Sequence, residues 1–312
     1  ILALLVLVGP AVFVVYWCAG RSADRFAASV SRITVTARAI CEGAVDMRIT
    51  SSEEEDFAET LRAYTAVNKL ADKSNKDLEE MRRLERVRSE FLANVSHELR
   101  TPIFSIQGFL ETLLDGALDD EEVRRQFVEK AYSNTVRLNS LLTDLINISL
   151  IESGEMRCSV RYFPLIPLVR EITRNLEAQA QGKNVTITVH EPEEDDVEVY
   201  GDRDRLAQVL TNLIENAIKY NVDKGTVDVW LKPGETEILV QIQDMGIGIP
   251  PEHHKRIFER FYRVDKNRSR SVGGTGLGLA IVKHILEAHK SALHLKSEPG
   301  KGTTISFTLK TD

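Results

Sequence analysis

The 312-residue chain is poor in cysteine, poor in aromatic residues and carries no excess of basic charge. Its three cysteines, Cys18, Cys41 and Cys158, are odd in number and scattered, so we expect neither a disulfide framework nor a cysteine metal site. The net charge of -7 gives no reason to expect direct binding to nucleic acid. Aromatic residues make up only 6% of the chain, which fits helices and one ordinary core in two or three modest domains.

Charge is absent from residues 1–19, ILALLVLVGPAVFVVYWCA. At ~1.5 Å per residue this run nearly crosses a hydrocarbon layer of ~30 Å, and it predicts a transmembrane helix. A signal peptide is disfavoured, because no basic residues precede the run and no small-residue cleavage site follows it. Arg21 and Arg25 come next, so the positive-inside rule places the residues after about 20 in the cytoplasm of a membrane-anchored protein. Because Ile1 already lies inside the apolar run, we expect a missing N-terminal part, such as an earlier span and an external sensor.

Residues 20–75 read as two helices joined by a connector. Apolar residues recur at spacings of three and four before and after Gly43, at Phe26, Val30, Ile33 and Ala37 and then at Phe57, Leu61, Tyr64, Val67 and Leu70. A helix, a connector and a helix directly after a membrane span resemble a HAMP relay. The proline usual in the first HAMP helix is absent, so an unspecialised coiled-coil linker stays open as the alternative.

The stretch from Phe91 to Pro102, FLANVSHELRTP, sets a histidine beside a carboxylate. At ~100° per residue, His97 lies opposite an apolar arc of its helix, and Glu98 and Thr101 share its polar side. An exposed imidazole next to a carboxylate suits a nucleophile, because the acidic neighbour holds the tautomer of the ring and sharpens its free nitrogen. Pro102 removes one backbone N–H and predicts a bend beside this site. A solvated surface histidine is the plain alternative.

Residues 76–155 predict a helical hairpin. The charged segment 76–90 runs into the His97 helix without a breaker, and the acidic turn around Gly116 separates it from a second helix. The second helix carries a heptad seam with one polar member, at Phe127, Ala131, Asn134, Leu138, Leu141, Leu145 and Ile148. One hairpin cannot hide such apolar surface alone. Two copies are therefore expected to form a dimeric four-helix bundle.

From about residue 160 the pattern changes to mixed helices and strands. Helices are expected at 164–181, 202–220 and 276–288, and strands at 185–190, 197–200, 227–231, 238–243, 292–296 and 303–309. Mixed elements with several hairpin-like strand pairs predict an α+β sandwich for residues 160–312. The fold class is therefore multidomain: a transmembrane helix, an all-α hairpin and a C-terminal α+β domain.

An asparagine-rich helix carries the first of three short motifs in this domain. In NLIENAIKY, residues 212–220, one polar arc holds Asn212, Asn216, Lys219 and Tyr220. Amide oxygens suit a hard cation such as Mg²⁺, for which Asn216 is the expected ligand, and a lysine suits phosphate. An amphipathic helix with an ordinary polar face would show the same pattern on its own.

The second motif is DMGIGIP, residues 244–250, directly after a strand. Asp244 can accept a hydrogen bond from an adenine amino group. Gly246 and Gly248 let the backbone approach a base and its phosphates. A lone DxGxG is a weak signal, because many turns share it.

The third motif is GGTGLG, residues 273–278, at the start of a helix. Backbone N–H groups at a helix start form an anion cradle, for which the expected residues are Gly274, Thr275, Gly276, Leu277 and Gly278. A Rossmann dinucleotide site is disfavoured, because the motif follows a long loop and not the first strand of a βαβ unit.

The loop before this motif, residues 250–274, holds seven basic residues against three acidic ones. Arg263 and Arg268 are the members expected to reach a nucleotide. Such a basic loop with glycines at its end suits a lid over a triphosphate. A solvated surface loop is the alternative.

The order of these motifs resembles the N, G1, F and G2 boxes of bacterial sensor histidine kinases, with FERF at 258–261 as the F box and the stretch around His97 as the H box. The resemblance implies a membrane-bound kinase of a two-component system, similar to phosphate-regulon and cell-wall sensors. It implies a Bergerat-type ATP-binding fold that uses ATP and Mg²⁺. His97 would be phosphorylated with Glu98 as general base, and the E-x-x-T pattern ending at Thr101 would serve a phosphatase activity.

The partners implied by the resemblance are a second copy of the chain and a response regulator, expected to be a DNA-binding transcription factor. One departure is AHKS at 288–291, where the family usually has a His-Gly-Gly turn. Two rivals stay open: an ATPase of the same fold that moves domains, and a scaffold with a decayed kinase. The stimulus and the choice between cis and trans phosphorylation are not specified by the sequence.

Overall fold

The structure, a computed structural model, describes residues 2–44, 46–50, 58–153, 158–193, 197–264 and 275–311. It divides the chain into two compact units, residues Ile1–Glu90 and Phe91–Asp312. The first unit contains helix α1, Leu2–Cys41, and the first part of helix α2, Ala58–Thr112. Across the described ranges, no helix combines the length and the apolar character that a membrane crossing requires. The transmembrane helix expected at residues 1–19 stays a prediction.

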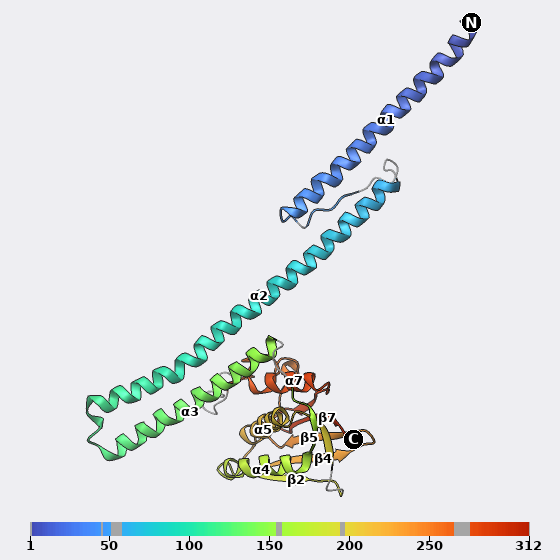
Figure 1. The fold of residues 1–312 in the computed structure, drawn as a ribbon. Coiled ribbons are helices and arrows are strands. Elements are labelled where there is room, and N and C mark those ends of the chain that lie inside the picture. The colour runs from blue at the N-terminus through green and yellow to red at the C-terminus, as the bar shows by residue number, and fades with distance from the viewer. Residues whose placement is uncertain are drawn as a thin grey trace. The chain divides into compact units, whose positions relative to one another are not determined.

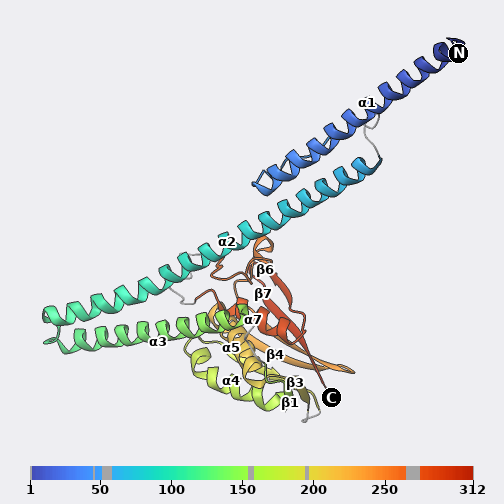
Figure 2. The same ribbon diagram turned by 45° about the horizontal axis from the view of Figure 1, so that its top comes forward.

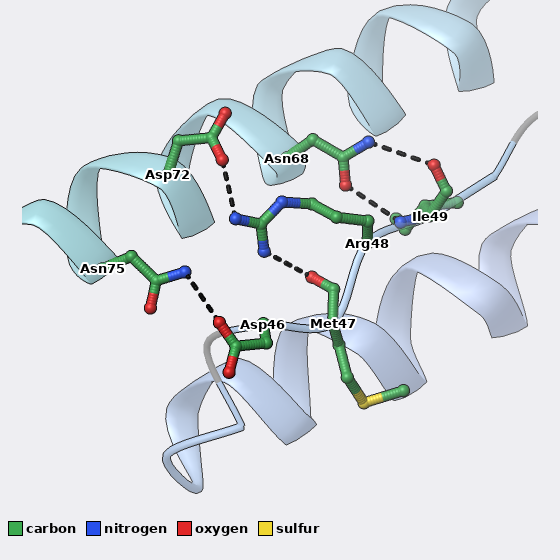
Figure 3. A network of polar contacts seen from close by, with 7 residues as sticks. All are labelled: Asp46, Met47, Arg48, Ile49, Asn68, Asp72 and Asn75. Atoms are coloured by element: carbon green, nitrogen blue, oxygen red, sulfur yellow. Dashed lines mark hydrogen bonds and ion pairs between the residues drawn. The ribbon is translucent and has the colours of Figure 1, made fainter.

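The connector between α1 and α2 is fastened to α2 by side chains (Figure 3). Asn68 uses its amide like a backbone group, since its Nδ2 donates to the carbonyl of Ile49 at 3.0 Å and its Oδ1 accepts from the Ile49 N–H at 2.9 Å. Arg48 pairs with Asp72 at 2.6 Å. Ile49 is buried, with 7% of its surface exposed. The expected order of helix, connector and helix is therefore present, and its assignment as a HAMP relay stays a prediction.

In the second unit, α2 and α3 form the expected helical hairpin (Figure 1). Helix α2 continues through Pro102, so the proline does not end it. The turn begins with η1, a π-helical segment at Leu113–Ala117 in which Gly116 has φ +119°, a value that favours glycine. Helix α3, Glu121–Glu152, starts at Asp120, whose carboxylate accepts hydrogen bonds from two backbone N–H groups of the first turn.

Part of the apolar seam of α3 packs against the C-terminal domain and not only within the helical hairpin. Leu141 and Ile148 belong to the hydrophobic core of the C-terminal domain and are 3% and 0% exposed. The heptad pattern alone would assign both residues to packing between helices of a bundle. Other apolar side chains of the hairpin remain exposed, among them Leu92, Ile103, Phe104, Leu110, Leu114, Val128, Val136, Leu142 and Ile146.

The C-terminal domain is built on a five-stranded sheet in the order β2-β4-β5-β7-β6. Its strands are β2 Thr186–His190, β4 Thr226–Pro233, β5 Glu237–Asp244, β6 His294–Glu298 and β7 Gly302–Lys310; a separate pair joins β1 Arg161–Pro164 to β3 Glu198–Gly201. The β4–β5 and β6–β7 pairs are antiparallel hairpins, as expected. Strand β2 pairs with β4 in parallel, and β1 was not predicted.

Three helices, α4 Leu165–Gln181, α5 Arg203–Lys219 and α7 Gly278–Ala288, cover one face of this sheet (Figure 2). The strands alternate accordingly: in β4, Val227, Val229 and Leu231 are buried and the residues between them are only half-buried. Helix α5 begins at Asp202, which accepts hydrogen bonds from two N–H groups of the first turn. The predicted α+β sandwich is therefore present.

The turn after α7, where the expected glycines are replaced, is held by His289. His289 Nδ1 donates to the carbonyl of Ile285 at 2.7 Å, while its Nε2 accepts from the Asp202 N–H at 2.9 Å. Lys290 takes the left-handed conformation, with φ +57°. The departure from the family sequence thus changes the residues of this turn and still ties α7 to the start of α5.

Candidate active site

Helix α2 presents the three expected phosphoacceptor-site residues on one polar side. His97 and Thr101 are exposed, and the Thr101 hydroxyl donates to the His97 carbonyl at 3.3 Å. Glu98 is half-buried and faces Arg137 of α3, with 3.8 Å between Oε2 and Nη2. The imidazole is therefore open to a reaction partner, while the adjacent carboxylate is held by the neighbouring helix.

Helix α5 supplies the asparagine-rich side of the site. The apolar face of α5 packs against the sheet and is buried. On the opposite face of the helix, Asn212, Asn216, Lys219 and Tyr220 are half-buried. The Lys219 ammonium lies 5.1 Å from the centre of the Tyr220 ring. All four predicted residues therefore share one surface of one helix.

The electrostatics of this surface are unusual. The pKa of Lys219 is lowered to about 8, chiefly by burial and then by the positive charges of Arg263 and Arg137, which the carboxylate of Glu215 only partly offsets. Burial also raises the pKa of Glu215, and the nearby charge of Asp144 adds to that rise. A half-buried lysine near other cations is suited to bind an anionic ligand, because the negative charge of the ligand would balance the positive charges around it.

The Asp244 loop closes against the end of α5. Oδ1 of Asp244 accepts from the N–H groups of Gly246 at 2.7 Å and Thr303 at 3.1 Å, and burial raises the pKa of this carboxyl. The Ile247 N–H donates to the Tyr220 carbonyl at 3.1 Å. A Cβ on Gly246 would collide with that carbonyl, so the glycine is needed for the loop to reach the helix. The first and second motifs are thus joined directly.

Gly248, also predicted for the site, has φ +68° and backs onto the β6–β7 hairpin. A Cβ there would collide with the carbonyl of Glu298. Its role in the structure is therefore to let the loop turn tightly against that hairpin.

The glycine-rich motif reaches the same helix from the other side. Gly276 has φ +73° and accepts a hydrogen bond from the Phe261 N–H at 2.9 Å. A Cβ on Gly278 would touch the Asn212 side chain at 3.5 Å, so the start of α7 lies against α5. Leu277 is fully buried in the core, which leaves only its backbone for a ligand. All three motifs therefore meet around α5.

Two of the predicted nucleotide-site residues, Arg268 and Gly274, lie outside the described residues. Arg263 lies inside them and acts on the charge of Lys219. Thr275 is also described, and its hydroxyl donates to Oδ2 of Asp144 on α3 at 2.9 Å.

Sequence reasoning did not single out Arg137 or Asp144. Both lie on α3, where their spacing looks like that of ordinary polar positions beside a heptad seam. Glu215 was visible within the asparagine-rich motif but was given no role. Only the packing of α3 against the C-terminal domain distinguishes these three residues.

The donor set fits a Mg²⁺ ion that arrives with phosphates. In the ranges that the structure describes, no three His, Cys, Asp or Glu side chains gather into a metal site. Asn216 offers an amide oxygen, and Mg²⁺ in nucleotide sites is typically held by one or two protein oxygens together with phosphate oxygens and water.

Two protein families match the chain. Residues 87–154 match the His Kinase A (phospho-acceptor) domain, and residues 201–312 match the histidine kinase-, DNA gyrase B-, and HSP90-like ATPase. The first match contains the stretch around His97, and the second contains all three nucleotide motifs.

Among curated proteins, sensor histidine kinase WalK of Bacillus subtilis is 37% identical over 235 residues, which is 75% of this chain and 38% of WalK. Phosphate regulon sensor protein PhoR of Pseudomonas aeruginosa is 37% identical over 231 residues, 74% of this chain and 52% of PhoR. The chain therefore spans about half or less of the length of these relatives. Among solved structures, histidine kinase ThkA in complex with response regulator protein TrrA is similar with a TM-score of 0.56 at 27% identity, over 76% of this chain and 66% of that chain.

Proposed function

The chain belongs to the sensor histidine kinases, and from that premise we propose that it phosphorylates its own His97 from ATP and passes the phosphoryl group to an aspartate of a response regulator. The observation that carries the proposal is the meeting of three nucleotide motifs around α5, in the same compact unit as the exposed His97 and its carboxylate neighbour. An ATP site with an exposed histidine nucleophile in the same unit is what autophosphorylation needs.

The chemistry follows from the two residues on α2. A nitrogen of the His97 imidazole attacks the γ-phosphorus of ATP, and a P–N bond forms. The bond from the γ-phosphorus to the bridging oxygen breaks, its electron pair stays with that oxygen, and ADP leaves. Glu98 takes the proton from the other ring nitrogen as general base, so no charge accumulates on the imidazole.

The residues around α5 bind and orient the substrate. Oδ2 of Asp244 accepts a hydrogen bond from the adenine amino group. Lys219 and Arg263 face the phosphates. Mg²⁺, held by Asn216 together with substrate oxygens, would supply charge neutralisation of the phosphates. The N–H groups at the start of α7 add an anion cradle.

The partners are a second copy of the chain and a response regulator. The apolar side chains left exposed along the hairpin support dimerisation, because a second hairpin can cover them. The regulator is expected to dock on the helices around His97, and ThkA, a structural relative, has been solved in complex with a response regulator. By likeness to the phosphate regulon sensor, the regulator is proposed to be a DNA-binding transcription factor.

Membrane attachment is a separate part of the proposal. It rests on the uncharged run of residues 1–19 and on Arg21 and Arg25 after it. Sedimentation with phospholipid vesicles tests it: the full chain should sediment with the vesicles, and a chain starting at residue 20 should stay in the supernatant. Equal distribution of the two would refute the anchor.

The central experiment uses the full chain with γ-labelled ATP and the purified regulator. The label should appear on the chain in an acid-labile, base-stable form and then move to the regulator. An ATPase that only moves domains would release labelled phosphate without labelled protein, and a scaffold would not bind ATP. Either result would refute the proposed function.

A further inference from the structure

Arg137 on α3 and Glu98 on α2 form an ion pair across the hairpin. Their closest atoms, Nη2 and Oε2, are 3.8 Å apart, and the two side chains are 36% and 26% exposed. An ion pair this long and this exposed adds little to the stability of a fold. Its location is more informative, because Glu98 directly follows His97 and is its proposed general base.

Helix α3 presents Arg137 on the face that meets the nucleotide domain. Leu141, Asp144 and Ile148 follow it by four, seven and eleven residues, and at ~100° per residue all three lie within about 40° of Arg137 around the helix. Leu141 and Ile148 are buried in the core of the nucleotide domain, and Asp144 accepts the hydrogen bond from Thr275. Arg137 therefore lies one helical turn before Leu141, on the face of α3 that contacts the nucleotide domain.

Helix α2 presents Glu98 in a similar way. Phe91 lies seven residues before Glu98, on the same face, and its ring centre is 5.7 Å from that of Phe261. Leu99, next to Glu98, packs against the hydrophobic cluster that joins Leu141 and Ile148 of α3 to the nucleotide domain. The Glu98–Arg137 pair consequently lies along the faces with which both helices of the hairpin contact that domain.

The charge of Arg137 is felt inside the nucleotide site. The charged groups that act on Lys219 are Arg263, Arg137 and Lys183, which disfavour its protonated form, and Glu215, which favours it. Positive charge therefore gathers there from both the nucleotide domain and the hairpin. A planar guanidinium with several N–H donors is well suited to phosphate oxygens.

We propose that Arg137 is a positioning residue of autophosphorylation, which holds the Glu98 carboxylate beside His97 and brings the charge of the hairpin to the site that receives the terminal phosphate of ATP. The inference rests on the proposed function, because it takes His97 as the acceptor. Arg137 forms and breaks no covalent bond. Its guanidinium stays paired with Glu98, and its positive charge acts on the phosphate site through space, as it does on Lys219.

The test compares variants of the full chain. Arg137→Gln should lower the single-turnover rate of autophosphorylation at saturating ATP by about tenfold or more, because small losses of alignment cost that much. Binding of ADP, which lacks the terminal phosphate, should stay close to wild type. Arg137→Lys keeps the charge and should recover part of the rate. The matched control is Arg125→Gln, which removes an arginine of the same helix that pairs with Glu129 in solvent.

A second readout separates positioning from a structural role. Because Arg137 lowers the pKa of Lys219, ATP binding by Arg137→Gln should weaken at a higher pH than binding by the wild type. A mere loss of helix stability would not move this pH. Glu98→Gln combined with Arg137→Gln should slow the reaction by less than the product of the two single effects, since the residues act through one another.

The outcomes distinguish a failure of the proposed function from a failure of the role of Arg137 alone. A wild type that takes no label refutes the proposed function. A wild type that labels, with Arg137→Gln behaving like Arg125→Gln, refutes only the role of Arg137. If Arg137→Gln is slower, melts at a lower temperature and loses ATP binding at the same pH as the wild type, Arg137 serves only the fold, and the inference is refuted. Fully independent effects of Glu98→Gln and Arg137→Gln would also refute it.

Discussion

The Thr275 hydroxyl donates a hydrogen bond to Oδ2 of Asp144 at 2.9 Å, which links the glycine-rich loop of the nucleotide domain to the second helix of the hairpin. The same hydroxyl oxygen accepts from the Leu277 N–H at 3.2 Å, so it also shapes the start of α7. Burial raises the pKa of Asp144, and the bond from Thr275 opposes that rise only in part. One carboxyl group thus carries a desolvation cost at the contact between the two elements.

Asp144→Asn should stabilise the chain near neutral pH. The pKa of Asp144 is raised in the folded state. The native protein therefore loses free energy of unfolding as pH rises from the ordinary pKa of 3.8 through the folded pKa. An amide keeps an oxygen for Thr275 and removes the penalty. The variant should therefore melt at a higher temperature than the wild type near pH 7, and the difference should shrink toward pH ~4. Asp204→Asn, at a carboxylate that is 93% exposed, is the control, and a difference independent of pH would contradict the explanation.

His97→Gln should abolish labelling of the chain by γ-labelled ATP, because the glutamine side chain has no nucleophilic nitrogen. ATP affinity should stay within about twofold of the wild type, since His97 lies on α2 while the nucleotide motifs lie around α5, and separate sites act almost independently. Labelling is measured on acid- and base-treated gels, and affinity by calorimetry. His294→Gln, at an exposed histidine of β6, should label normally. Phosphohistidine that survives in His97→Gln would move the acceptor elsewhere.

Asp244→Asn should weaken ATP binding by roughly 10- to 100-fold, the usual cost of leaving a buried polar partner unsatisfied. An asparagine can keep the oxygen that accepts from Gly246 and Thr303, so the loop should hold its shape. Its second group is a donor and cannot accept from the adenine amino group. Calorimetry with ATP and GTP checks the prediction: the preference for ATP should largely disappear. An unchanged preference would remove Asp244 from base recognition.

ATP affinity should fall as pH rises through about 8, the pKa of Lys219. Below that pH the ammonium is charged and attracts phosphate, and above it the neutral amine does not. Lys219→Arg stays charged and should abolish this fall. Glu215→Gln removes the carboxylate that supports the protonated form, so its fall should come at lower pH. Affinity that is flat from pH 7 to 9 in the wild type would exclude Lys219 from phosphate binding.

Thr101→Ala should keep autophosphorylation within about threefold of the wild type while slowing dephosphorylation of the phosphorylated regulator by about tenfold or more, as expected for loss of a group that orients water. The hydroxyl at present donates to the His97 carbonyl at 3.3 Å, a weak bond that it can exchange for a water. Thr101→Ser should retain both activities. Equal loss of both in Thr101→Ala would assign the residue to the helix around Pro102.

Local patterns in the sequence predicted most of the elements and the parts of the site that depend on near neighbours. The period of about 3.6 residues identified α4, α5 and α7, and the glycines of the second and third motifs marked the turns where Gly246 and Gly276 approach other backbone. The placement of Asn212, Asn216, Lys219 and Tyr220 on one face followed from helix geometry alone. These features could be predicted because they depend on residues a few positions apart.

Only the tertiary structure decided how these parts act on one another. The parallel pairing of β2 with β4, the burial of Leu141 and Ile148 in the neighbouring domain, and the pKa of Lys219 all depend on distant segments. Thr275 and Asp144 are separated by 131 positions, and no period in the sequence connects them. Burial and Coulomb energy depend on distance in space, whereas sequence patterns report distance along the chain. For that reason the chemistry of the nucleotide site was visible in its motifs, and the contribution of the hairpin to that site was visible only in the fold.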